Sequence, residues 1–383
     1  MHLVKKSIAL VVMLLPVALN AEVPADPVPN VASLPSSYPD TWLFVHESNA
    51  HNGMIGQTLI VDAASANRHL KGSIQSSLLG NFAEAKSRSE LYANETVYSR
   101  GTYGERTDLI VVYDKATLNP IAEIVLPAEK RALMMPRKAM FTLSGDEQFG
   151  LVYNFTPAAS VTVVDLIKRA VVGEVNIPGC TMIYPMGPRS FITLCGNGSM
   201  AAIALDSDGK LASENVSKVF NDIDKDPLFM DSALVNDVRY FVSFRGHVQP
   251  LGLAGGAGTI LKTWSLLDAA DAKESWRPSG AQVLSADRAG RLYVLMRKGA
   301  RDGEHGAGGG EVWVYDVSSQ TRLMRIPLRK EGRVIEATRG QEALLAVVNA
   351  DQELDVYAAD SGKFIRRIGG WRDITPFSLY AVK

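Results

Sequence analysis

The chain has 383 residues, of which 46% are hydrophobic and 21% are charged. This length is enough for a large core, either in two domains or in one large repeat fold. The 40 basic and 41 acidic residues nearly balance. Proteins that bind nucleic acid usually carry a basic excess, so the charge balance argues against that function.

The N-terminus has the pattern of a secretory signal peptide. Two lysines precede an apolar run from Ile8 to Leu19, and the small residue Ala21 follows. A membrane anchor is the alternative, but the run is shorter than the roughly 20 residues that span a bilayer comfortably. We therefore expect residues 1–21 to be removed on export. No later segment is long and apolar enough to span a membrane.

The segment that follows, residues 22–40, is rich in proline and small polar residues. Proline removes a backbone donor and disfavours helix, so this composition predicts an extended arm. We expect the folded part of the protein to comprise residues 41–383.

From residue 41 on, the chain repeats a unit of short apolar strands separated by polar turns. Five copies are clear: TLIVDAASANRHLKGSI, LIVVYDKATLNPIAEIVLP, SVTVVDLIKRAVVGEVNIP, EVWVYDVSSQTRLMRIPL and LDVYAADSGKFIRRIGGW. In each copy apolar and polar residues alternate with a period of two, and Val, Ile and aromatic residues are frequent, which is typical of strands. Successive aspartates at one strand end, such as Asp62, Asp114 and Asp165, lie about 50 residues apart.

A four-stranded unit that repeats at this spacing is typical of a β-propeller blade. We count seven units and predict an all-β fold, a seven-bladed β-propeller of four-stranded blades. The first copy lacks its innermost strand, whereas a spare strand, TPFSLYAVK, follows the last copy. We therefore expect the C-terminal strand to complete the N-terminal blade and to close the ring, which leaves no exposed sheet edge.

Two cysteines, Cys180 and Cys195, are the only ones in the chain. In an oxidising compartment an even pair at short spacing is most simply a disulfide. A zinc site would need further ligands, and none lies nearby in the sequence. We predict a disulfide between the two.

Motifs for catalysis or nucleotide binding are missing from the sequence, which has no G-x-S-x-G, H-E-x-x-H, C-x-x-C or P-loop pattern. No two histidines have metal-ligand spacing. The glycine-rich loop 302–310 does not follow a strand and open a helix, so it predicts a flexible loop and not a phosphate cradle. It carries His305, and long propeller loops are often functional. The lack of a recognisable catalytic motif in the sequence favours a scaffold or binding subunit.

Three stretches resemble the heavy (large, beta) chains of quinoprotein amine dehydrogenases, namely methylamine and aromatic amine dehydrogenases. GERTDLIVVYDKATLNPIAEIVLP resembles the family's G-x-R-T-D run and the two strands after it. CTMIYPMGPRSFITLCGNGSMAAIAL is similar to the family's disulfide hairpin. WRPSGAQVLSADRAGRLYVLM and EHGAGGGEVWVYD resemble its W-R-P-G-G segment and its His-containing loop. The stretches lie in different repeats, so chance is a poor explanation.

The resemblance implies a periplasmic heavy chain of a seven-bladed propeller fold. In the family a small, cysteine-rich light chain carries the tryptophan tryptophylquinone cofactor, and a chain with two cysteines cannot be that subunit. We therefore expect no catalytic residue, metal or cofactor in this chain, and a light chain as its partner. The implied reaction converts a primary amine to an aldehyde and ammonia. Electrons would pass to a small blue-copper protein or a cytochrome, and two heavy and two light chains would form a heterotetramer.

The resemblance also marks residues for the substrate entrance or the light-chain interface: His51, Asn52, Glu105, Arg106, Asp108 and His305. Asn52 stands after His51, where the family can place a gating phenylalanine. Within the charged cluster, Arg106 and Asp108 either pair and fix the shape of their loop or face the partner subunit.

Two other functions stay open. One is a non-catalytic periplasmic propeller scaffold of the same family with a different partner. The other is a self-sufficient propeller enzyme, such as a metal-dependent lactonase, which would need carboxylates, Asn or His clustered in the central channel.

Overall fold

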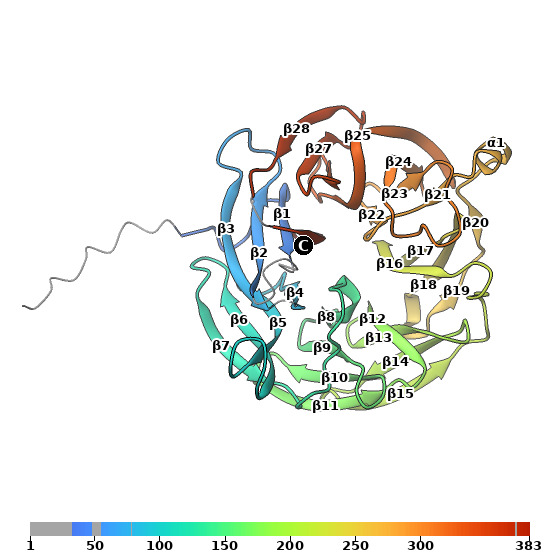
Figure 1. Cartoon of the computed structure of the whole chain (residues 1–383). Coiled ribbons are helices and arrows are strands. Elements are labelled where there is room, and N and C mark those ends of the chain that lie inside the picture. The colour runs from blue at the N-terminus through green and yellow to red at the C-terminus, as the bar shows by residue number, and fades with distance from the viewer. Residues whose placement is uncertain (1–32, 48–54, 78, 372–373) are drawn as a thin grey trace, which may run out of the picture. The chain divides into compact units, whose positions relative to one another are not determined.

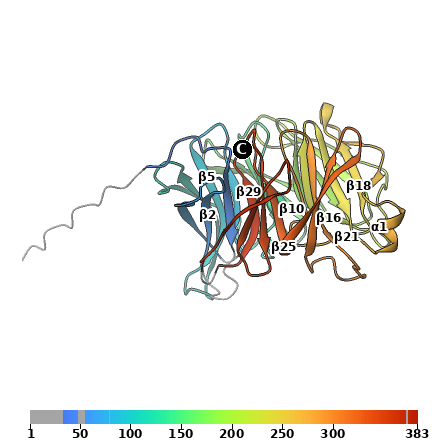
Figure 2. The ribbon, with the colours of Figure 1, turned by 90° about the horizontal axis from the view of Figure 1, so that it is seen from above.

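Antiparallel sheets arranged in a ring make up the protein (Figure 1). The computed structural model describes residues 33–47, 55–77, 79–371 and 374–383. Residues Leu34–Lys383 form one compact unit. Seen from its edge, the ring has two faces, and the strands run between them (Figure 2).

The sheet that begins the ring also ends it. Its order is β29-β1-β2-β3, with β29 (Pro376–Ala381), β1 (Trp42–Glu47), β2 (Ile55–Asp62) and β3 (Leu70–Ser77). All six residues of β1 are buried, and β29 pairs with β1 in antiparallel fashion. The expectation that the C-terminal strand completes the N-terminal blade is confirmed.

Four further sheets have the size of single blades, and in each the first strand lies nearest the centre of the ring (Figure 1). The first two are β4 (Asn81–Glu84), β5 (Glu90–Tyr98), β6 (Arg106–Asp114) and β7 (Pro120–Val125), and β8 (Phe141–Leu143), β9 (Phe149–Asn154), β10 (Ser160–Asp165) and β11 (Ala170–Asn176). The third contains β12 (Cys180–Met186), β13 (Ser190–Cys195), β14 (Met200–Leu205) and β15 (Leu211–Val216). The fourth contains β16 (Leu228–Val235), β17 (Val238–Ser243), β18 (His247–Gly252), β19 (Thr259–Ile260) and β20 (Trp264–Ser265).

The remaining strands form one continuous sheet of eight strands. They are β21 (Arg277–Pro278), β22 (Leu284–Ala286), β23 (Arg291–Arg297), β24 (Gly309–Asp316), β25 (Thr321–Ala337), β26 (Leu344–Asn349), β27 (Leu354–Ala358) and β28 (Phe364–Ile368). The 17-residue strand β25 pairs with β24 mainly through its first half and with β26 through its second half.

The prediction of seven separate four-stranded blades is therefore wrong. The described strands form five blade-sized sheets and one eight-stranded sheet. The physical reason lies in the middle of β25, where the segment PLRKEG offers no Asn, Asp or Pro-Gly turn before Gly332. The backbone stays extended there and shifts register by a bulge near Gly332 instead of breaking into two strands.

The repeated aspartates shape the turns between the third and fourth strands. A carboxylate oxygen of Asp165 accepts the backbone N–H groups of Ile167 and Lys168, each at 2.9 Å. Asp114 and Asp316 hold the equivalent turns in the same way. This is the side-chain-to-backbone bonding that makes aspartate a preferred turn residue.

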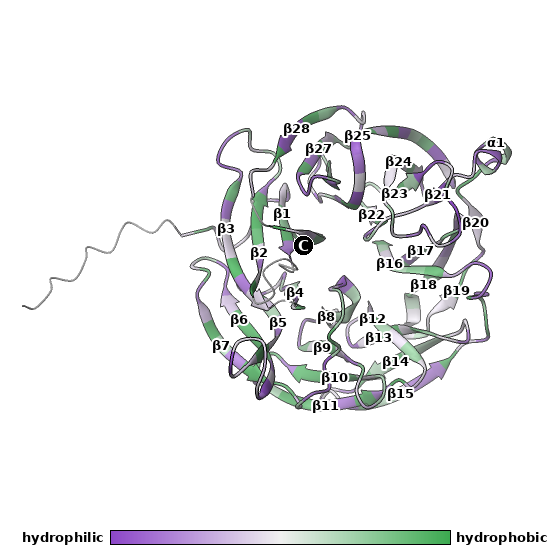
Figure 3. Ribbon diagram, in the orientation of Figure 1, coloured by the Kyte–Doolittle hydropathy of each residue, from purple (hydrophilic) through white to green (hydrophobic). Residues whose placement is uncertain are grey.

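The core lies between neighbouring sheets. Tyr92 and Val112, from one sheet, pack in the same buried cluster as Phe141 and Val152 from the next. Strand residues alternate between the two faces of a sheet, so each sheet contributes apolar side chains to both neighbours. Hydrophobic residues accordingly concentrate in the strands and hydrophilic residues in the connections (Figure 3).

Helix is confined to short segments of the described chain: η1 (Lys138–Met140), η2 (Ala254–Gly256) and α1 (Ala269–Lys273). Asp268 caps α1 by accepting the backbone N–H groups of Ala270 and Asp271, each at 2.8 Å. None of the helices in the described residues is long and apolar enough to span a membrane.

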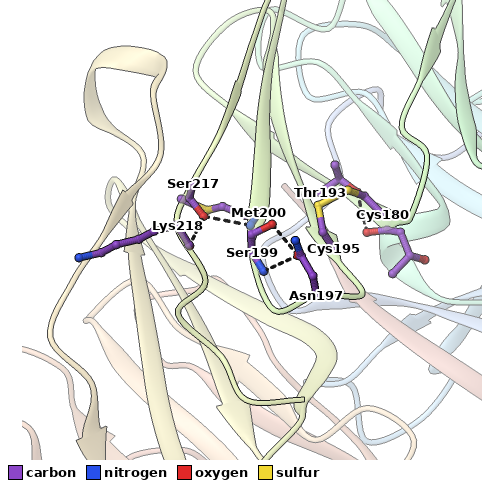
Figure 4. The surroundings of a disulfide bond; sticks show 9 residues. Cys180, Thr193, Cys195, Asn197, Ser199, Met200, Ser217 and Lys218 are labelled. Atoms are coloured by element: carbon purple, nitrogen blue, oxygen red, sulfur yellow. Dashed lines mark hydrogen bonds between the residues drawn. A yellow bond between two sulfur atoms is a disulfide. The ribbon is translucent and has the colours of Figure 1, made fainter. Parts of the chain in front are cut away.

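The predicted disulfide between Cys180 and Cys195 is confirmed (Figure 4). The two residues lie opposite each other at the ends of β12 and β13. Beside them, the hydroxyl of Thr193 donates to the carbonyl of Thr181 at 2.7 Å. In the turn that follows, Asn197 accepts the hydroxyl and the backbone N–H of Ser199.

Replacing both cysteines, Cys180→Ser with Cys195→Ser, should lower the free energy of unfolding by about 3 kcal/mol, because the reduced chain regains the entropy of a loop of this size. Urea unfolding under non-reducing conditions measures the loss. Reduced wild-type protein is the control and should match the double variant. Equal stability of the oxidised wild type and the double variant would contradict the expectation.

Candidate functional site

Two kinds of connection leave the sheets on the same side of the ring. They join the second strand of a sheet to its third, or the outermost strand to the next sheet. Because neighbouring strands are antiparallel, both kinds emerge at one end of the strands. We call this side the loop face; its described connections include 99–105, 126–137, 196–199, 217–227, 244–246 and 298–308. The opposite side, which carries the other turns, is the turn face.

The residues marked by the sequence for the entrance or interface map to the loop face as far as they are described. Glu105 is exposed in the loop between β5 and β6, and Arg106 and Asp108 begin β6. His305 lies in the loop between β23 and β24. His51 and Asn52 lie outside the described residues.

Arg106 and Asp108 pair with each other. The Nε and Nη2 atoms of Arg106 each lie 3.0 Å from a carboxylate oxygen of Asp108. Asp108 is almost fully buried, and Arg106 also donates to the carbonyl of Arg131 at 2.8 Å. The pair therefore ties the start of β6 to the 126–137 connection. This arrangement corresponds to the alternative in which Arg106 and Asp108 pair and fix the shape of their loop. Glu105 remains exposed for a partner.

Beneath this pair lies Arg131, a buried arginine that the sequence analysis missed. Its Nη1 donates to Thr96 Oγ1 at 2.8 Å, and its Nη2 donates to the carbonyls of Asn94, at 3.0 Å, and Leu79. Burial lowers the pKa of Arg131 to about 10, and the negative charge of Asp108 opposes that shift. The only hint in the sequence is a basic residue directly before the apolar run ALMMP.

Glu95 is a buried carboxyl group in the same region. Among the described residues, its Oε1 has no hydrogen-bond partner. Burial raises the pKa of Glu95 to about 7; the positive charge of Arg131 opposes the shift, and the negative charge of Glu123 adds to it. The folded protein therefore holds a proton on Glu95 in mildly acidic solution.

His46 is a structural histidine. It is fully buried in β1, and its ring nitrogens lie 2.8 Å from Thr58 Oγ1 and from the carbonyl oxygen of Gly80. Burial lowers the pKa of His46 to about 4, so the ring is neutral at physiological pH. Both nitrogens are occupied by protein groups, which leaves neither for a ligand.

A cavity of about 640 Å³ opens on the loop face. Its apolar lining includes Met135, Phe229, Phe244 and Phe377. His305 also lines it and meets Phe244 edge-on, with 6.1 Å between ring centroids. Apolar walls with a few polar groups are typical of a binding pocket.

The glycine-rich loop beside this cavity is anchored by the segment that precedes β22. The hydroxyl of Ser279 donates to the carbonyl of Glu304, and the backbone N–H of Gly280 donates to the carbonyl of His305, each at 2.8 Å. A Cβ on Gly280 would lie 2.8 Å from the carbonyl oxygen of Arg333. Glycine at this position therefore allows the close approach to Arg333, while its own N–H helps to hold the loop of His305 at the cavity.

Large apolar side chains are exposed on the loop face: Leu133, Met134, Met135 and Phe155, of which Met135 also lines the cavity. The backbone N–H of Phe155 donates to the carbonyl of Lys130 at 3.0 Å, so the two connections that carry these side chains are held together. We call these four residues the apolar rim. Exposed apolar side chains gathered on one face of a protein are typical of a protein-binding surface.

Charged side chains at the cavity form ion pairs, so its wall carries no obvious net charge. Asp302 lies 2.6 Å from Nη1 of Arg277 and 3.6 Å from Nη2 of Arg245. Within the described part of the chain, no three His, Cys, Asp or Glu side chains come together as potential metal ligands. The arrangement suits the docking of an apolar surface.

The pKa of Glu95 gives stability a specific pH dependence. The folded state binds a proton up to about pH 7, whereas the unfolded chain releases it near the ordinary value of 4.5. Between these values the folded state holds more protons, so stability falls as pH rises, by a total on the order of 3 kcal/mol.

Glu95→Gln should remove this decline and make the protein more stable than wild type above pH 7. Urea unfolding from pH 5 to pH 8 measures the two slopes. Glu105→Gln, at an exposed glutamate of the neighbouring loop, is the control and should keep the wild-type slope. If the slope of Glu95→Gln equals that of wild type, Glu95 is not the group that titrates.

Comparison with known proteins assigns the family. The family described as methylamine dehydrogenase heavy chain (MADH) matches residues 42–373. The methylamine dehydrogenase heavy chain of Methylobacillus flagellatus is 30% identical over 299 residues, which cover 77% of this chain and 74% of the relative. That of Paracoccus versutus is 28% identical over 336 residues, which cover 86% of this chain and 77% of the relative.

Among solved structures, dihydro-heme d1 dehydrogenase aligns with a TM-score of 0.53 and 16% sequence identity, over 90% of this chain and 76% of that chain. At that identity the likeness concerns the fold alone. The family match, by contrast, spans most of the sequence and includes the sheets that build the loop face. The chain therefore belongs to the methylamine dehydrogenase heavy-chain family.

Proposed function

We propose that this protein is the heavy-chain subunit of a periplasmic amine dehydrogenase. Its loop face binds a small, cysteine-rich light chain that carries tryptophan tryptophylquinone. The complex oxidises a primary amine to an aldehyde and ammonia, and a small copper protein or a cytochrome accepts the electrons. Family membership supports this assignment, and so does the signal-peptide pattern of the N-terminus.

The observation that carries the proposal is the apolar rim on the loop face, which reaches the 640 Å³ cavity at Met135. A stable protein–protein interface buries roughly 800 Å² on each partner, with an apolar centre and a polar margin. The apolar rim offers such a centre. Burial of exposed apolar surface contributes about 25 cal/mol per Å² before the costs of association.

Charge at the loop face is compatible with docking. Arg245 and Arg277 share Asp302, and Lys225 pairs with Asp222 at 3.1 Å. A partner that covers the cavity would meet cations that already have carboxylate neighbours. Covering an unpaired charge would instead cost several kcal/mol.

In this proposal the heavy chain contributes shape and leaves the chemistry to its partner. His305 and Phe244 form part of the cavity wall, and the bonds from Ser279 and Gly280 to the 298–308 loop keep that wall in place. Both cysteines are joined in one disulfide. A light chain seated on the apolar rim would place its cofactor at an entrance shaped by these groups.

Purification of the full complex from its native periplasm tests the assignment. We expect a small, cysteine-rich chain with visible quinone absorbance to copurify, and we expect primary amines to drive reduction of a redox dye. A stable partner without quinone absorbance or dye reduction would favour the non-catalytic scaffold. Amine-independent activity of this chain alone would favour the self-sufficient enzyme.

Aspartate substitutions in the apolar rim test the docking face. Met134 and Phe155 are 37% and 65% exposed, so Met134→Asp and Phe155→Asp should fold normally. Each should weaken light-chain binding about tenfold or more, because a buried apolar side chain contributes roughly 1.5–3 kcal/mol. Titration of the separated chains, followed by dye reduction, measures the change.

Ile167→Asp is the matched control, because Ile167 is 61% exposed in the turn between β10 and β11, on the turn face. It should bind the light chain as wild type does. If Ile167→Asp weakens binding as much as the rim variants, the light chain does not dock on the loop face.

A further inference from the structure

The central channel holds a second cavity, of about 410 Å³, that no step of the proposed function uses. The innermost strands line it, including β4, β8, β12, β16 and β29. Lys86 and Arg339 follow β4 and β25 in connections of the turn face, and Lys383 follows β29. The cavity therefore reaches the turn face, on the side of the ring opposite the loop face.

Two of the four carboxylates that line this cavity have lysine partners. Glu84 lies 2.8 Å from the Nζ of Lys115, and it also accepts the backbone N–H of Lys383 at 2.9 Å. Glu336 lies 2.7 Å from the Nζ of Lys138. These carboxylates are already neutralised.

The other two carboxylates are also engaged. Glu147 accepts the backbone N–H groups of Lys86 and Ser87, at 2.7 and 2.8 Å. Asp231 is buried, which raises its pKa, and Arg137 lies 3.9 Å away on its loop-face side. The cavity carboxylates thus have partners other than Arg239 and Arg339.

Arg239 is a buried cation without a carboxylate partner. It is 9% exposed, and its Nη atoms donate to Ser232 Oγ at 3.1 Å and to the carbonyl of Pro185 at 3.0 Å. Among the described residues its Nε has no partner, and no carboxylate lies within ion-pair distance. Burial lowers the pKa of Arg239 to about 10, so the group stays charged at neutral pH. A buried charge without a counter-charge is costly unless a ligand supplies one.

Four more cations line the same cavity; of these, Lys138 pairs with Glu336, and the Nζ of Lys383 donates to the carbonyl of Glu84 at 3.1 Å. In the described part of the chain, neither the guanidinium of Arg339 nor the Nζ of Lys86 makes a hydrogen bond or an ion pair. Cations that converge on a cavity with low-dielectric walls attract anions by focusing the electric field. Arginine in particular binds oxyanions through its planar set of N–H donors.

We propose that the turn-face cavity binds a small oxyanion, with Arg239 as the buried anchor and Arg339 and Lys86 nearer the entrance. A phosphate or a short carboxylate supplies the required chemistry. The bound anion would neutralise Arg239, whose own bonds join β12 to β16, and would stabilise that seam between two sheets. The site is independent of the loop face, so it does not depend on a light chain.

Binding is tested on the full chain by isothermal titration with inorganic phosphate and, separately, with succinate, in buffer of constant ionic strength set with sodium chloride. Thermal unfolding in the same solutions provides a second readout. We expect saturable binding of at least one oxyanion and a matching rise in Tm. Arg239→Gln should weaken binding roughly tenfold or more, as expected for loss of a charged hydrogen-bond donor.

Arg339→Gln with Lys86→Gln is the second variant, because these two side chains make no bond that folding requires. It should weaken binding several-fold even if Arg239→Gln fails to fold. Arg288→Gln is the control: Arg288 is an exposed arginine of the turn face that pairs with Asp40 outside the cavity. The proposal is overturned if neither oxyanion binds saturably, or if the Arg339–Lys86 variant binds as tightly as the Arg288 control.

Discussion

The pairing of β29 with β1 is the constraint on which the rest of the structure depends. A ring of sheets has no stable end unless its first and last segments meet, because an open edge presents unpaired backbone groups. Here the two ends of the described chain meet in one sheet, and β1 is buried along its whole length. The closed ring then fixes the position of every connection around it. Loops that are distant in sequence, such as those that carry Glu105 and His305, come to share one face for this reason.

The two faces of the ring have different chemical character. The loop face combines an apolar rim with arginines that already pair with a carboxylate, which suits a protein partner. The channel toward the turn face combines apolar walls with cations that have no carboxylate partner among the described residues, which suits a small anion. Antiparallel strands make this separation possible, since each strand carries one end to each face. A residue's position along its strand therefore decides to which of the two surfaces it contributes.

The sequence contained enough information for the strands, the ring closure and the disulfide. Alternating Val and Ile runs, the spare C-terminal strand and two cysteines are local signals, and each has one simple interpretation. The joining of two expected blades through β25 was not predictable in the same way, because repeats of similar length suggest separate sheets, whereas the backbone stays extended through Gly332 and forms a bulge there. The buried polar groups Glu95 and Arg131 also escaped prediction. In sequence both look like solvent-exposed charges, and only contacts between β5 and the 126–137 connection bury them.

The continuous strand β25 also affects where the ring can flex. A loop between two sheets can change its backbone dihedral angles at little cost and so can act as a hinge, whereas an extended strand whose two halves are each hydrogen-bonded to a neighbouring strand has less freedom to do so. The strands on either side of β25 are therefore joined without an intervening loop, in one sheet of eight strands whose neighbours have four and five. The other sheets are joined by loops, among them the long connection 217–227 between β15 and β16. Slow opening of the ring would concentrate at such loop-joined seams and not at β25.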